Sequence, residues 1–363
     1  MIPSVKSMRL GVLAVAAAFA FGACTTAATT APTAAPAASS AATAAPTAAS
    51  GALPSPEQTK VSIGLSVTEM SQYAGVLAKQ LGIYEKNGLD VDYTVFEGDG
   101  RAVAALQADQ IDISFTGTSS AISSQLTDVP FVIIGVMAAQ LTDDLVCQGP
   151  IKTADDVKGK TIAISTFGGT SNAAALLSLK ALNLAANDAV ITQVGGQSAR
   201  IAALVGGSID CAIVDSNMEA DMTAQGFSIA AKLKEAGIEY GRSGIGVRKD
   251  WLAANRNTAL VVLASVLEAQ NMIFDDPASV VPHYAEFAQI EAAKAEPLVA
   301  DFGKVGNRAM MWTDEAFKNP QKAIAVVNPD IIDVNLADAY DRTLLEELVS
   351  NGFYEKIGAP VPS

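Results

Sequence analysis

Two copies of one sequence pattern, about 98 residues apart, set the strongest limit on how this chain can fold. Three pairs of similar segments make up the copies: VSIGLS (61–66) with KTIAIS (160–165), GDGRAVAAL (98–106) with GQSARIAAL (196–204), and QADQIDISF (107–115) with VGGSIDCAI (205–213). This offset is far longer than the roughly 20- to 50-residue period of a solenoid repeat. The 363-residue chain is therefore expected to build two related units.

Each unit has the same predicted order of elements, which is strand, helix, strand, short helix and strand. The expected strands span residues 61–66, 89–96 and 111–115 in the first unit and 161–165, 189–194 and 209–214 in the second. The expected helices span residues 71–86 and 101–108, then 171–182 and 199–206. This alternation predicts parallel strands joined by right-handed crossovers. Each unit is thus expected to be a small, open, mainly parallel α/β sheet flanked by helices.

The chain is predicted to cross between the units twice. FVIIGVMAAQ (131–140) is expected to be a fourth strand of the first unit, after which 141–151 leads into the second unit and 241–251 returns. Two crossings make a double-strand hinge, with the second unit inserted into the first. The expected boundaries are 57–146 plus 243–363 for the first lobe and 147–242 for the second. Helical spacing of apolar residues across 251–350 predicts a helical tail on the lobes.

The N-terminus has the pattern of a secretion signal. Residues 1–23 carry two basic residues and then the apolar run GVLAVAAAFAFGA, which is too short to span a membrane comfortably. The sequence Phe21-Gly22-Ala23-Cys24 resembles a bacterial lipobox. That resemblance implies cleavage before Cys24 and a lipid on its thiol; the alternative is ordinary signal cleavage with an unmodified cysteine.

Residues 24–56 are expected to be the lipid-anchor cysteine and a disordered linker. From Thr25 to Ser50 the chain contains only Ala, Thr, Pro and Ser. Such a segment cannot bury enough apolar surface to fold, and its prolines break helices. It is expected to tether a globular body to a membrane surface.

Composition excludes several function classes. A formal net charge of −14 without a basic patch argues against nucleic-acid binding. The only histidine is His283, and no cysteine cluster has metal-ligand spacing, so neither a metal nor a cofactor is expected. Cys147 and Cys211 lie in apolar, strand-like runs. In an exported protein they either pair or remain buried free thiols.

Loops at the carboxyl ends of the predicted strands carry the candidate site. Ligands of open α/β sheets gather at this edge. The candidate ligand-binding residues are Glu69, Tyr73, Thr116, Gly117, Thr118, Ser119, Ser165, Phe167, Gly168, Gly169, Thr170, Ser171, Asp215, Asn217 and Arg242.

Small residues at predicted helix starts are the first part of this site. Free N–H groups and the helix dipole favour an anion or an electron-rich ring oxygen there, and Ser119, Thr170 and Ser171 supply hydroxyls. Simple N-capping is the alternative for these residues. Gly168 and Gly169 are expected to let backbone N–H groups approach a bound group. This stretch is not a Walker loop, because no lysine follows the glycines.

Charged and aromatic side chains form the second part. Asp215 is expected to accept from a ligand amine, or else to cap the helix start that Ser216 and Glu219 mark. Arg242 binds a sulfonate or carboxylate bidentately, or pairs with Glu239 on the surface.

Further residues at this edge have two interpretations each. As cleft residues, Glu69, Glu97 and Asp99 exclude a bare anion; as rim residues they are solvated. Phe167 and Tyr73 stack on a flat ligand or pack in the core. Arg200 is expected on a helix surface.

Three segments resemble one known family. They are QYAGVLAKQLGIYEKNGLDVDY (72–93), ALQADQIDISFTGTSSA (105–121) and IKTADDVKGKTIAIS (151–165). Together they are similar to periplasmic (type II) solute-binding proteins of ABC importers, in the nitrate, sulfonate and taurine branch that includes binders of thiamine-pyrimidine-like and riboflavin-like solutes. The resemblance implies a non-catalytic, monomeric two-lobed clamp that holds a small molecule between its lobes and delivers it to an ABC permease.

Two other functions use the same fold. A ligand-presenting sensor subunit for a receptor kinase uses the same clamp. A pyrimidine-synthesising enzyme family shares the fold, and that resemblance would require iron, an active-site histidine and a cysteine-rich motif. This chain has only His283, in the predicted tail. Because no basic pocket is evident, the sequence favours a polar organic solute with N–H donors over nitrate.

Overall fold

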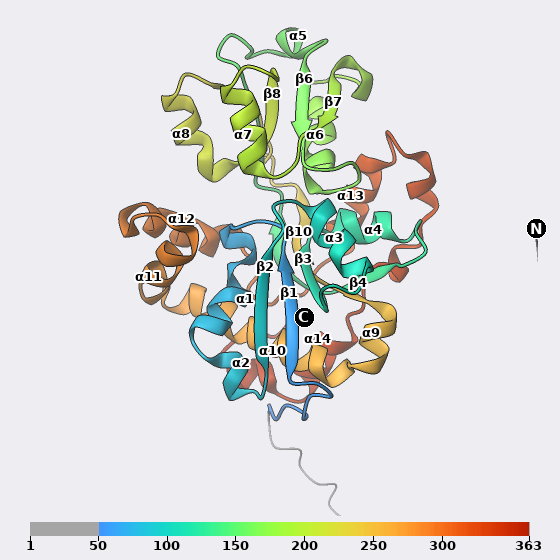
Figure 1. Cartoon of the computed structure of the whole chain (residues 1–363), viewed down its shortest axis with the longest axis vertical. Coiled ribbons are helices and arrows are strands. Elements are labelled where there is room, and N and C mark those ends of the chain that lie inside the picture. The colour runs from blue at the N-terminus through green and yellow to red at the C-terminus, as the bar shows by residue number, and fades with distance from the viewer. Residues whose placement is uncertain (1–50, 363) are drawn as a thin grey trace, which may run out of the picture. The chain divides into compact units, whose positions relative to one another are not determined.

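The structure, a computed structural model, describes residues 51–362. The predicted signal peptide, Cys24 and the linker up to Ser50 lie outside the described residues. The described chain forms two five-stranded sheets with helices packed around them (Figure 1). The two sheets define the two lobes.

The first sheet has the strand order β2-β1-β3-β10-β4. Its strands are β1 (Lys60–Leu65), β2 (Asp90–Val95), β3 (Ile113–Thr116), β4 (Phe131–Gln140) and β10 (Glu239–Arg248). Strands β1, β2 and β3 are parallel, whereas β10 runs antiparallel to β3 and β4. β3 is buried throughout, which its apolar run requires.

The second sheet repeats this arrangement with the order β7-β6-β8-β5-β9. Its strands are β5 (Asp143–Cys147), β6 (Thr161–Ile164), β7 (Val190–Gln193), β8 (Cys211–Asp215) and β9 (Ser228–Lys232). β6 is parallel to β7 and β8, and β5 is antiparallel to β8 and β9. The predicted mainly parallel α/β fold with two lobes is confirmed, with one antiparallel strand inside each sheet.

The internal repeat is visible in matching hydrogen bonds. Asp112 accepts from the N–H and hydroxyl of Ser62 at 2.8 and 2.7 Å. Asp210 accepts from the N–H and hydroxyl of Thr161 at 2.9 and 2.7 Å. These pairs occupy aligned positions of the two copies, and each ties the loop before the third strand to the first strand.

The crossings between sheets come a few residues earlier than the predicted boundaries. β5 begins at Asp143 and pairs along its whole length with β8, so 143–146 belong to the second sheet. β10 begins at Glu239 and pairs with β4, so 239–242 belong to the first. The sequence marks the apolar runs but not the partner of each run, and the partner decides the boundary.

Helices flank both sheets. Those of the repeat units are α1 (Met70–Gln80), α2 (Ile83–Lys86), α3 (Asp99–Gln107), α4 (Thr118–Ser124), α5 (Ala154–Val157), α6 (Thr170–Ala181), α7 (Gln197–Val205) and α8 (Glu219–Ala224). The single helix expected over 71–86 is two helices, because Gly82 adopts a left-handed conformation (φ 68°) between them.

The predicted helical tail is present. It contains α9 (Lys249–Ala254), α10 (Arg256–Asp275), α11 (Pro277–Ala288), α12 (Ala292–Val305), α13 (Glu315–Ile324), α14 (Thr343–Ser350) and α15 (Phe353–Lys356). Most of it packs on the first lobe (Figure 1), but α13 contacts both α4 of the first lobe and α6 of the second.

Helix α10 is the core helix of the first lobe. Among the described residues it alone is long and apolar enough to span a membrane, with a mean hydropathy of 1.3, but 78% of that stretch is buried in the body. Its N-terminus is closed by Glu57, whose carboxylate accepts from the N–H groups of Asn257 and Thr258 at 2.9 and 2.7 Å. This carboxylate complements the helix dipole. It also joins the segment before β1 to the start of α10.

The last part of the predicted linker is ordered. The N–H of Gly51 donates to the carbonyl of Asn351 at 2.6 Å, and Lys356 Nζ donates to the carbonyl of Gly51 at 2.9 Å. Residues 51–56 therefore belong to the body, because the chain end at α14 and α15 supplies partners for their backbone.

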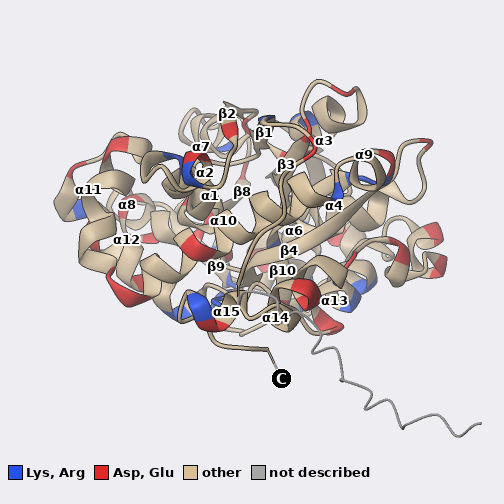
Figure 2. Cartoon of the chain, turned by 90° about the horizontal axis from the view of Figure 1, so that it is seen from below, with Lys and Arg blue, Asp and Glu red and all other residues tan. Residues whose placement is uncertain are grey.

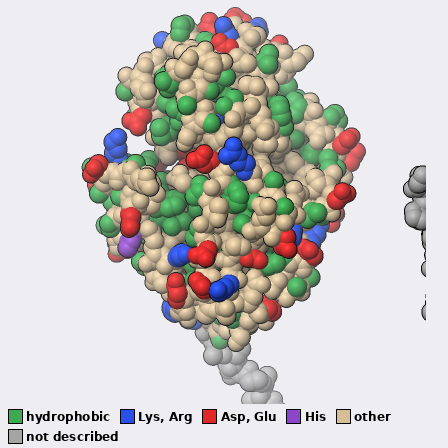
Figure 3. All heavy atoms as spheres, in the orientation of Figure 1, with side chains coloured by type: hydrophobic (Ala, Val, Ile, Leu, Met, Phe, Trp, Pro, Cys, Tyr) green, Lys and Arg blue, Asp and Glu red, His purple; other side chains and the backbone are tan. Residues whose placement is uncertain are grey.

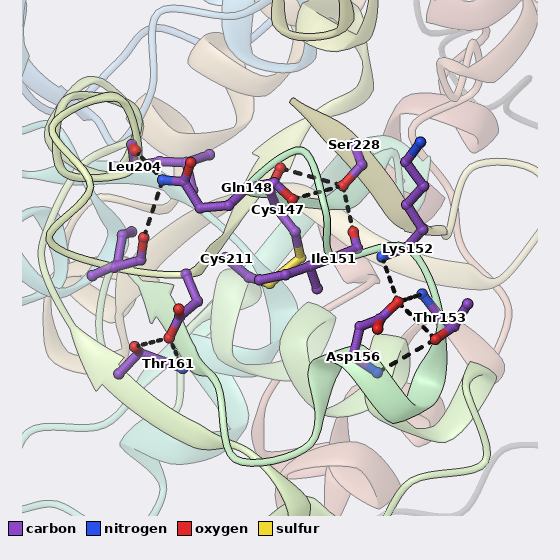
Figure 4. The surroundings of a disulfide bond; sticks show 12 residues. Cys147, Gln148, Ile151, Lys152, Thr153, Asp156, Thr161, Leu204, Cys211 and Ser228 are labelled. Atoms are coloured by element: carbon purple, nitrogen blue, oxygen red, sulfur yellow. Dashed lines mark hydrogen bonds between the residues drawn. A yellow bond between two sulfur atoms is a disulfide. The ribbon is translucent and has the colours of Figure 1, made fainter. Parts of the chain in front are cut away.

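Cys147 and Cys211 form a disulfide in the second lobe (Figure 4). They are directly opposite each other on the antiparallel strands β5 and β8. Both side chains are fully buried, and the bridge spans a sequence separation of 64 residues. Of the two alternatives that the sequence left open, the structure has the paired one.

Candidate functional site

The centre of the site is Arg242, a buried arginine on β10 that contacts three carboxylates. Its Nε donates to Asp143 at 3.1 Å, and its Nη2 donates to Glu69 at 2.8 Å and to Asp215 at 2.5 Å. Its Nη1 donates to the hydroxyl of Ser71 at 2.8 Å. Glu69 precedes α1 in the first lobe, whereas Asp143 begins β5 and Asp215 ends β8 in the second. One guanidinium therefore joins the two lobes.

Three carboxylates around one guanidinium leave this centre acidic. Burial disfavours charge on Arg242, but Asp143, Glu69 and Asp215 outweigh it and hold the pKa of the guanidinium well above its usual value. Burial raises the pKa of Glu69 to about 7, with a further rise from Asp215 and Asp143 and a partial offset from Arg242. Glu69 is thus poised to change its protonation near neutral pH.

Two small cavities lie against this centre, and Glu69 and Arg242 line both. Cavity A has a water-accessible volume of about 40 Å³, and its lining includes Glu69, Asp99, Asp143, Ser165, Thr170, Ser171, Gln197, Arg200 and Arg242. Cavity B has about 50 Å³, and its lining includes Glu69, Asp215, Asn217, Lys234, Arg242 and Asp301. Each volume holds a few water molecules or a comparably small polar group.

A larger hollow, the mouth, adjoins both cavities and also contains Glu69. Its water-accessible volume is about 210 Å³, and it is lined by Val95 of the first sheet, Tyr284 and Ile290 of the α11 region, and Met218 of the second lobe. Figure 3 shows a recess at this level, between the first-lobe helices and the second lobe, with acidic and basic side chains beside it. Polar residues, among them Glu97, Gln197 and Asn217, also line it, so the mouth has both apolar and polar walls.

Arg200 is buried on α7, not on a helix surface as expected. It is 5% exposed; its Nε donates to the carbonyl of Ile213 and its Nη1 to the carbonyl of Gly195, both at 2.8 Å. Burial lowers the pKa of its guanidinium. The repeat contains the missed signal, because Arg200 aligns with Ala102, which is fully buried on α3. An aligned buried position predicts that Arg200 also points inward.

The two lobes contact each other beside cavity A. Asp99 of α3 accepts from the N–H of Thr170 at the start of α6 at 3.0 Å, and the hydroxyl of Ser123 donates to the carbonyl of Gly168 at 3.1 Å. Gly168 has φ +78°, and a Cβ there would lie 2.9 Å from the Ser123 hydroxyl. A Cβ on Gly169 would lie 3.3 Å from the Asp99 carboxylate. Because the two glycines have no side chains, Asp99 and Ser123 of the first lobe can reach the backbone of the second lobe.

Several predicted hydroxyl residues surround this contact. Ser165 and Ser171 are hydrogen-bonded to each other at 2.7 Å on the wall of cavity A. The hydroxyls of Thr116, Ser119 and Thr170 are buried and have no partner among residues 51–362. Gly117 lies so close to Thr170 that a Cβ on it would be 2.0 Å from the threonine hydroxyl.

Eight predicted site residues line neither cavity nor the mouth. Five of them lie at or near the contact just described (Thr116, Gly117, Ser119, Gly168 and Gly169), and the other three are Tyr73, Thr118 and Phe167. Tyr73 is fully buried in the first lobe, where its ring packs against Tyr284 at 5.0 Å between centroids, so it is a core residue. Thr118 donates to the carbonyls of Gly241 and Ala316 and lines neither cavity. Phe167 is 59% exposed and lines a separate hollow of about 200 Å³ together with Val103 and Ser123 of the first lobe, so it lines neither cavity A nor cavity B.

Two wall residues were missed or only weakly indicated by the sequence. Asp143 was assigned only to a crossing segment, because its partner Arg242 is 99 residues away. Asp99 had the alternative interpretation of a solvated rim, yet it is 7% exposed, whereas its neighbour Glu97 is exposed. Both are buried by the other lobe, which a local pattern does not show.

Taken together, the two matched sheets, the double crossing and cavities at the strand ends define the two-lobed fold of periplasmic binding proteins. The chain belongs to the NMT1/THI5-like family, whose family model matches residues 71–280. The resemblance seen in the sequence is thereby confirmed. Among curated proteins, no match to this chain was found.

Solved structures share this fold at low sequence identity. The alkanesulfonate-binding protein SsuA from Xanthomonas axonopodis pv. citri, bound to MOPS, has a TM-score of 0.63 at 18% identity, covering 80% of this chain and 99% of that one. The periplasmic nitrate-binding protein NrtA from Synechocystis PCC 6803 has a TM-score of 0.66 at 15% identity, covering 85% and 92%. The desulfurization enzyme DSZB has a TM-score of 0.58 at 14% identity, covering 81% and 99%.

Proposed function

We propose that this chain is an extracytoplasmic solute-binding lipoprotein that holds a small organic solute between its two lobes and delivers it to an ABC permease. The observation that carries the proposal is the set of cavities A and B, which lie against strand ends of both lobes around Arg242. Walls contributed by both lobes allow a solute to draw the lobes together. Membership of a family whose fold is shared with periplasmic sulfonate- and nitrate-binding proteins supports this.

The solute that fits this site best carries N–H donors or a positive charge. Cavities A and B are lined by five carboxylates (Glu69, Asp99, Asp143, Asp215 and Asp301) and by three cations (Lys234, Arg200 and Arg242). Arg242 already contacts three of those carboxylates, so it offers little to an added sulfonate or nitrate. Asp215 and Glu69 are the residues that we propose accept from a ligand amine or ring N–H, with Ser165, Thr170, Ser171 and Asn217 as polar neighbours.

Export and anchoring fit the same proposal. The signal pattern of residues 1–23 supports export, and we propose that a lipid on Cys24 and the linker hold the site outside the membrane. The disulfide between Cys147 and Cys211 is of the kind that persists in oxidising compartments. The chain has 38 acidic and 24 basic residues, and the basic positions are scattered among acidic ones along the ribbon in Figure 2, which does not favour nucleic-acid binding. We propose that the protein acts as a monomer.

Two alternatives use the same fold. A sensor subunit that presents its solute to a receptor kinase needs the same clamp, and a permease encoded beside this chain separates the two. An enzyme of the fold has less support, because His283 lies on α11 and lines none of the cavities described above.

A thermal-shift panel tests the proposal. The purified chain is incubated with amines, guanidines and aminopyrimidines, and in parallel with alkanesulfonates and nitrate. A compound at 100-fold excess over its Kd stabilises the folded state by about 2.7 kcal/mol, which the melting temperature reports. We expect a rise with an N–H donor compound and none with the anions. The ligand class is wrong if an alkanesulfonate or nitrate gives the rise, and the binding role is wrong if no compound does.

A further inference from the structure

A carboxylate of the first lobe occupies the start of a helix in the second lobe. Asp99, at the first position of α3, is 7% exposed and accepts from the N–H of Thr170 at 3.0 Å. Thr170 opens α6, a helix of 12 residues, whose free N–H groups and dipole favour a negative charge there. Gly169, which has no side chain, leaves room for the carboxylate.

A buried arginine with one guanidinium nitrogen that makes no hydrogen bond to the described residues lines the same cavity. Arg200 is 5% exposed and lines cavity A together with Asp99 and Thr170. Its Nε and Nη1 are bound to carbonyls, and its Nη2 has no hydrogen-bond partner among the described residues. A helix start and a buried guanidinium with an unused nitrogen are together the complement of a small oxyanion.

We infer that the carboxylate of Asp99 occupies the anion-binding position of the solute site while the lobes are in contact. It therefore excludes anionic solutes from this site. This deepens the proposed function and rests on it only in taking cavity A as part of the solute site. A free oxyanion has to displace the Asp99 carboxylate or lie beside it and close to Glu69 and Asp143, which line the same cavity. A neutral or cationic solute meets no such repulsion.

The repeat shows that the charge at this position is a property of one lobe only. Asp99 aligns with Gln197, the first residue of α7. Gln197 also lines cavity A, and its side-chain oxygen accepts from the N–H of Asp215 at 2.7 Å. The aligned position of the second unit is therefore occupied by an uncharged residue. The fold of the repeat does not require a carboxylate at the first position of this helix. Asp99 is assigned as a specificity-determining residue.

The test is titration calorimetry with methanesulfonate and nitrate as probes. Asp99→Asn removes the charge and keeps an acceptor, Asp99→Ala also opens space, and Asp90→Asn removes one exposed charge at the far end of the first sheet as the control. We expect both Asp99 variants to bind methanesulfonate or nitrate at least tenfold more tightly than the wild type, and Asp90→Asn to match the wild type. Arg200→Gln added to Asp99→Ala should abolish the gain.

Several results would overturn the inference. These are no gain of anion binding in folded Asp99→Asn, an equal gain in Asp90→Asn, wild-type binding as tight as that of Asp99→Ala, or a gain that survives Arg200→Gln. Circular dichroism and melting temperature confirm that each variant is folded, and Asp99→Asn remains informative if Asp99→Ala does not fold. Failure of the proposed function gives a different result. In that case no N–H donor compound binds the wild type, whatever the Asp99 variants bind.

Discussion

The guanidinium of Arg242, on a strand of the first lobe, lies 2.5 Å from the carboxylate of Asp215 at the end of a strand in the second lobe. Both side chains are under 10% exposed, at 7% and 9%. Glu69 and Asp143 bind the same guanidinium. This group is therefore both a structural junction between lobes and the charged floor of cavities A and B.

Removing the cation should cost far more than removing an exposed one. Arg242→Met leaves three buried carboxylates without their partner, and we expect a loss of about 3–5 kcal/mol in the free energy of unfolding at pH 8. The loss should shrink at pH 5, where a buried carboxyl takes up a proton. Urea denaturation measures both values.

The matched control is Arg256→Met, whose ion pair with Glu347 is 42% and 37% exposed. Its cost should stay within about 1 kcal/mol. Equal losses in the two variants would mean that the Arg242 centre contributes no more than a surface pair.

Stability should fall as pH rises from about 5 to 8. In the folded chain the pKa of Glu69 is about 7, above its ordinary 4.5, because the side chain is buried. Burial, with Glu219 nearby, likewise raises the pKa of Asp144 from 3.8 to about 7. The folded state then holds protons that the unfolded chain has lost, so unfolding becomes easier as pH rises through this window.

Glu69→Gln should remove part of this pH dependence, on the order of 1–3 kcal/mol between pH 5 and 8. Asp144→Asn should remove another part. The measurement is the urea midpoint across pH. A slope that neither substitution changes would show that other groups take up the protons.

Gly168→Ala should disturb the contact between lobes as well as the backbone. Gly168 has φ +78°, and a Cβ there would lie 2.9 Å from the Ser123 hydroxyl, which would have to move away from the Gly168 carbonyl that it binds, whereas Gly159 has φ +72° and nothing within 4 Å. Gly159→Ala is therefore the control for backbone strain, which costs roughly 1–2 kcal/mol at a left-handed position. Only Gly168→Ala should also weaken binding of the compound that most stabilises the wild type. Equal affinities in both variants would argue against a role for the 165–172 loop.

Reduction of the disulfide should destabilise the second lobe. Cross-linking residues 64 positions apart restricts the unfolded chain by about 4 kcal/mol in the loop-entropy model. We expect Cys147→Ser with Cys211→Ser, and wild type in reductant, to lower the urea midpoint alike. If reductant lowers the midpoint of the wild type but the double variant keeps the oxidised wild-type value, the bridge does not carry this stability.

The sequence predicted the fold well because the repeat is a long-range signal that does not depend on local propensity. Aligning the two copies fixes which strands correspond, and the Ser62–Asp112 and Thr161–Asp210 hydrogen bonds show the result. The carboxyl-end rule then predicted Glu69, Thr170 and Asp215 at one edge, and the return crossing predicted Arg242 beside them; in the structure Arg242 contacts Glu69 and Asp215 and lines cavity A with Thr170.

The remaining site details depend on contacts between lobes. Asp143 and Asp99 are buried by partners 99 and 71 residues away, and no local pattern reports such partners. For Tyr73 and Phe167 the sequence leaves both stacking on a ligand and core packing open, and in the structure Tyr73 is in the core and Phe167 is exposed. Arg200 was predictable, because its aligned partner Ala102 lies on the inward face of α3.

The most direct test of the central claim is native mass spectrometry of the purified chain, followed by identification of any small molecule that it releases. We predict one solute per chain, carrying N–H donors, and its loss from Asp215→Asn. A stoichiometric sulfonate or nitrate in the wild type would contradict this account, as would a solute that Asp215→Asn retains in full.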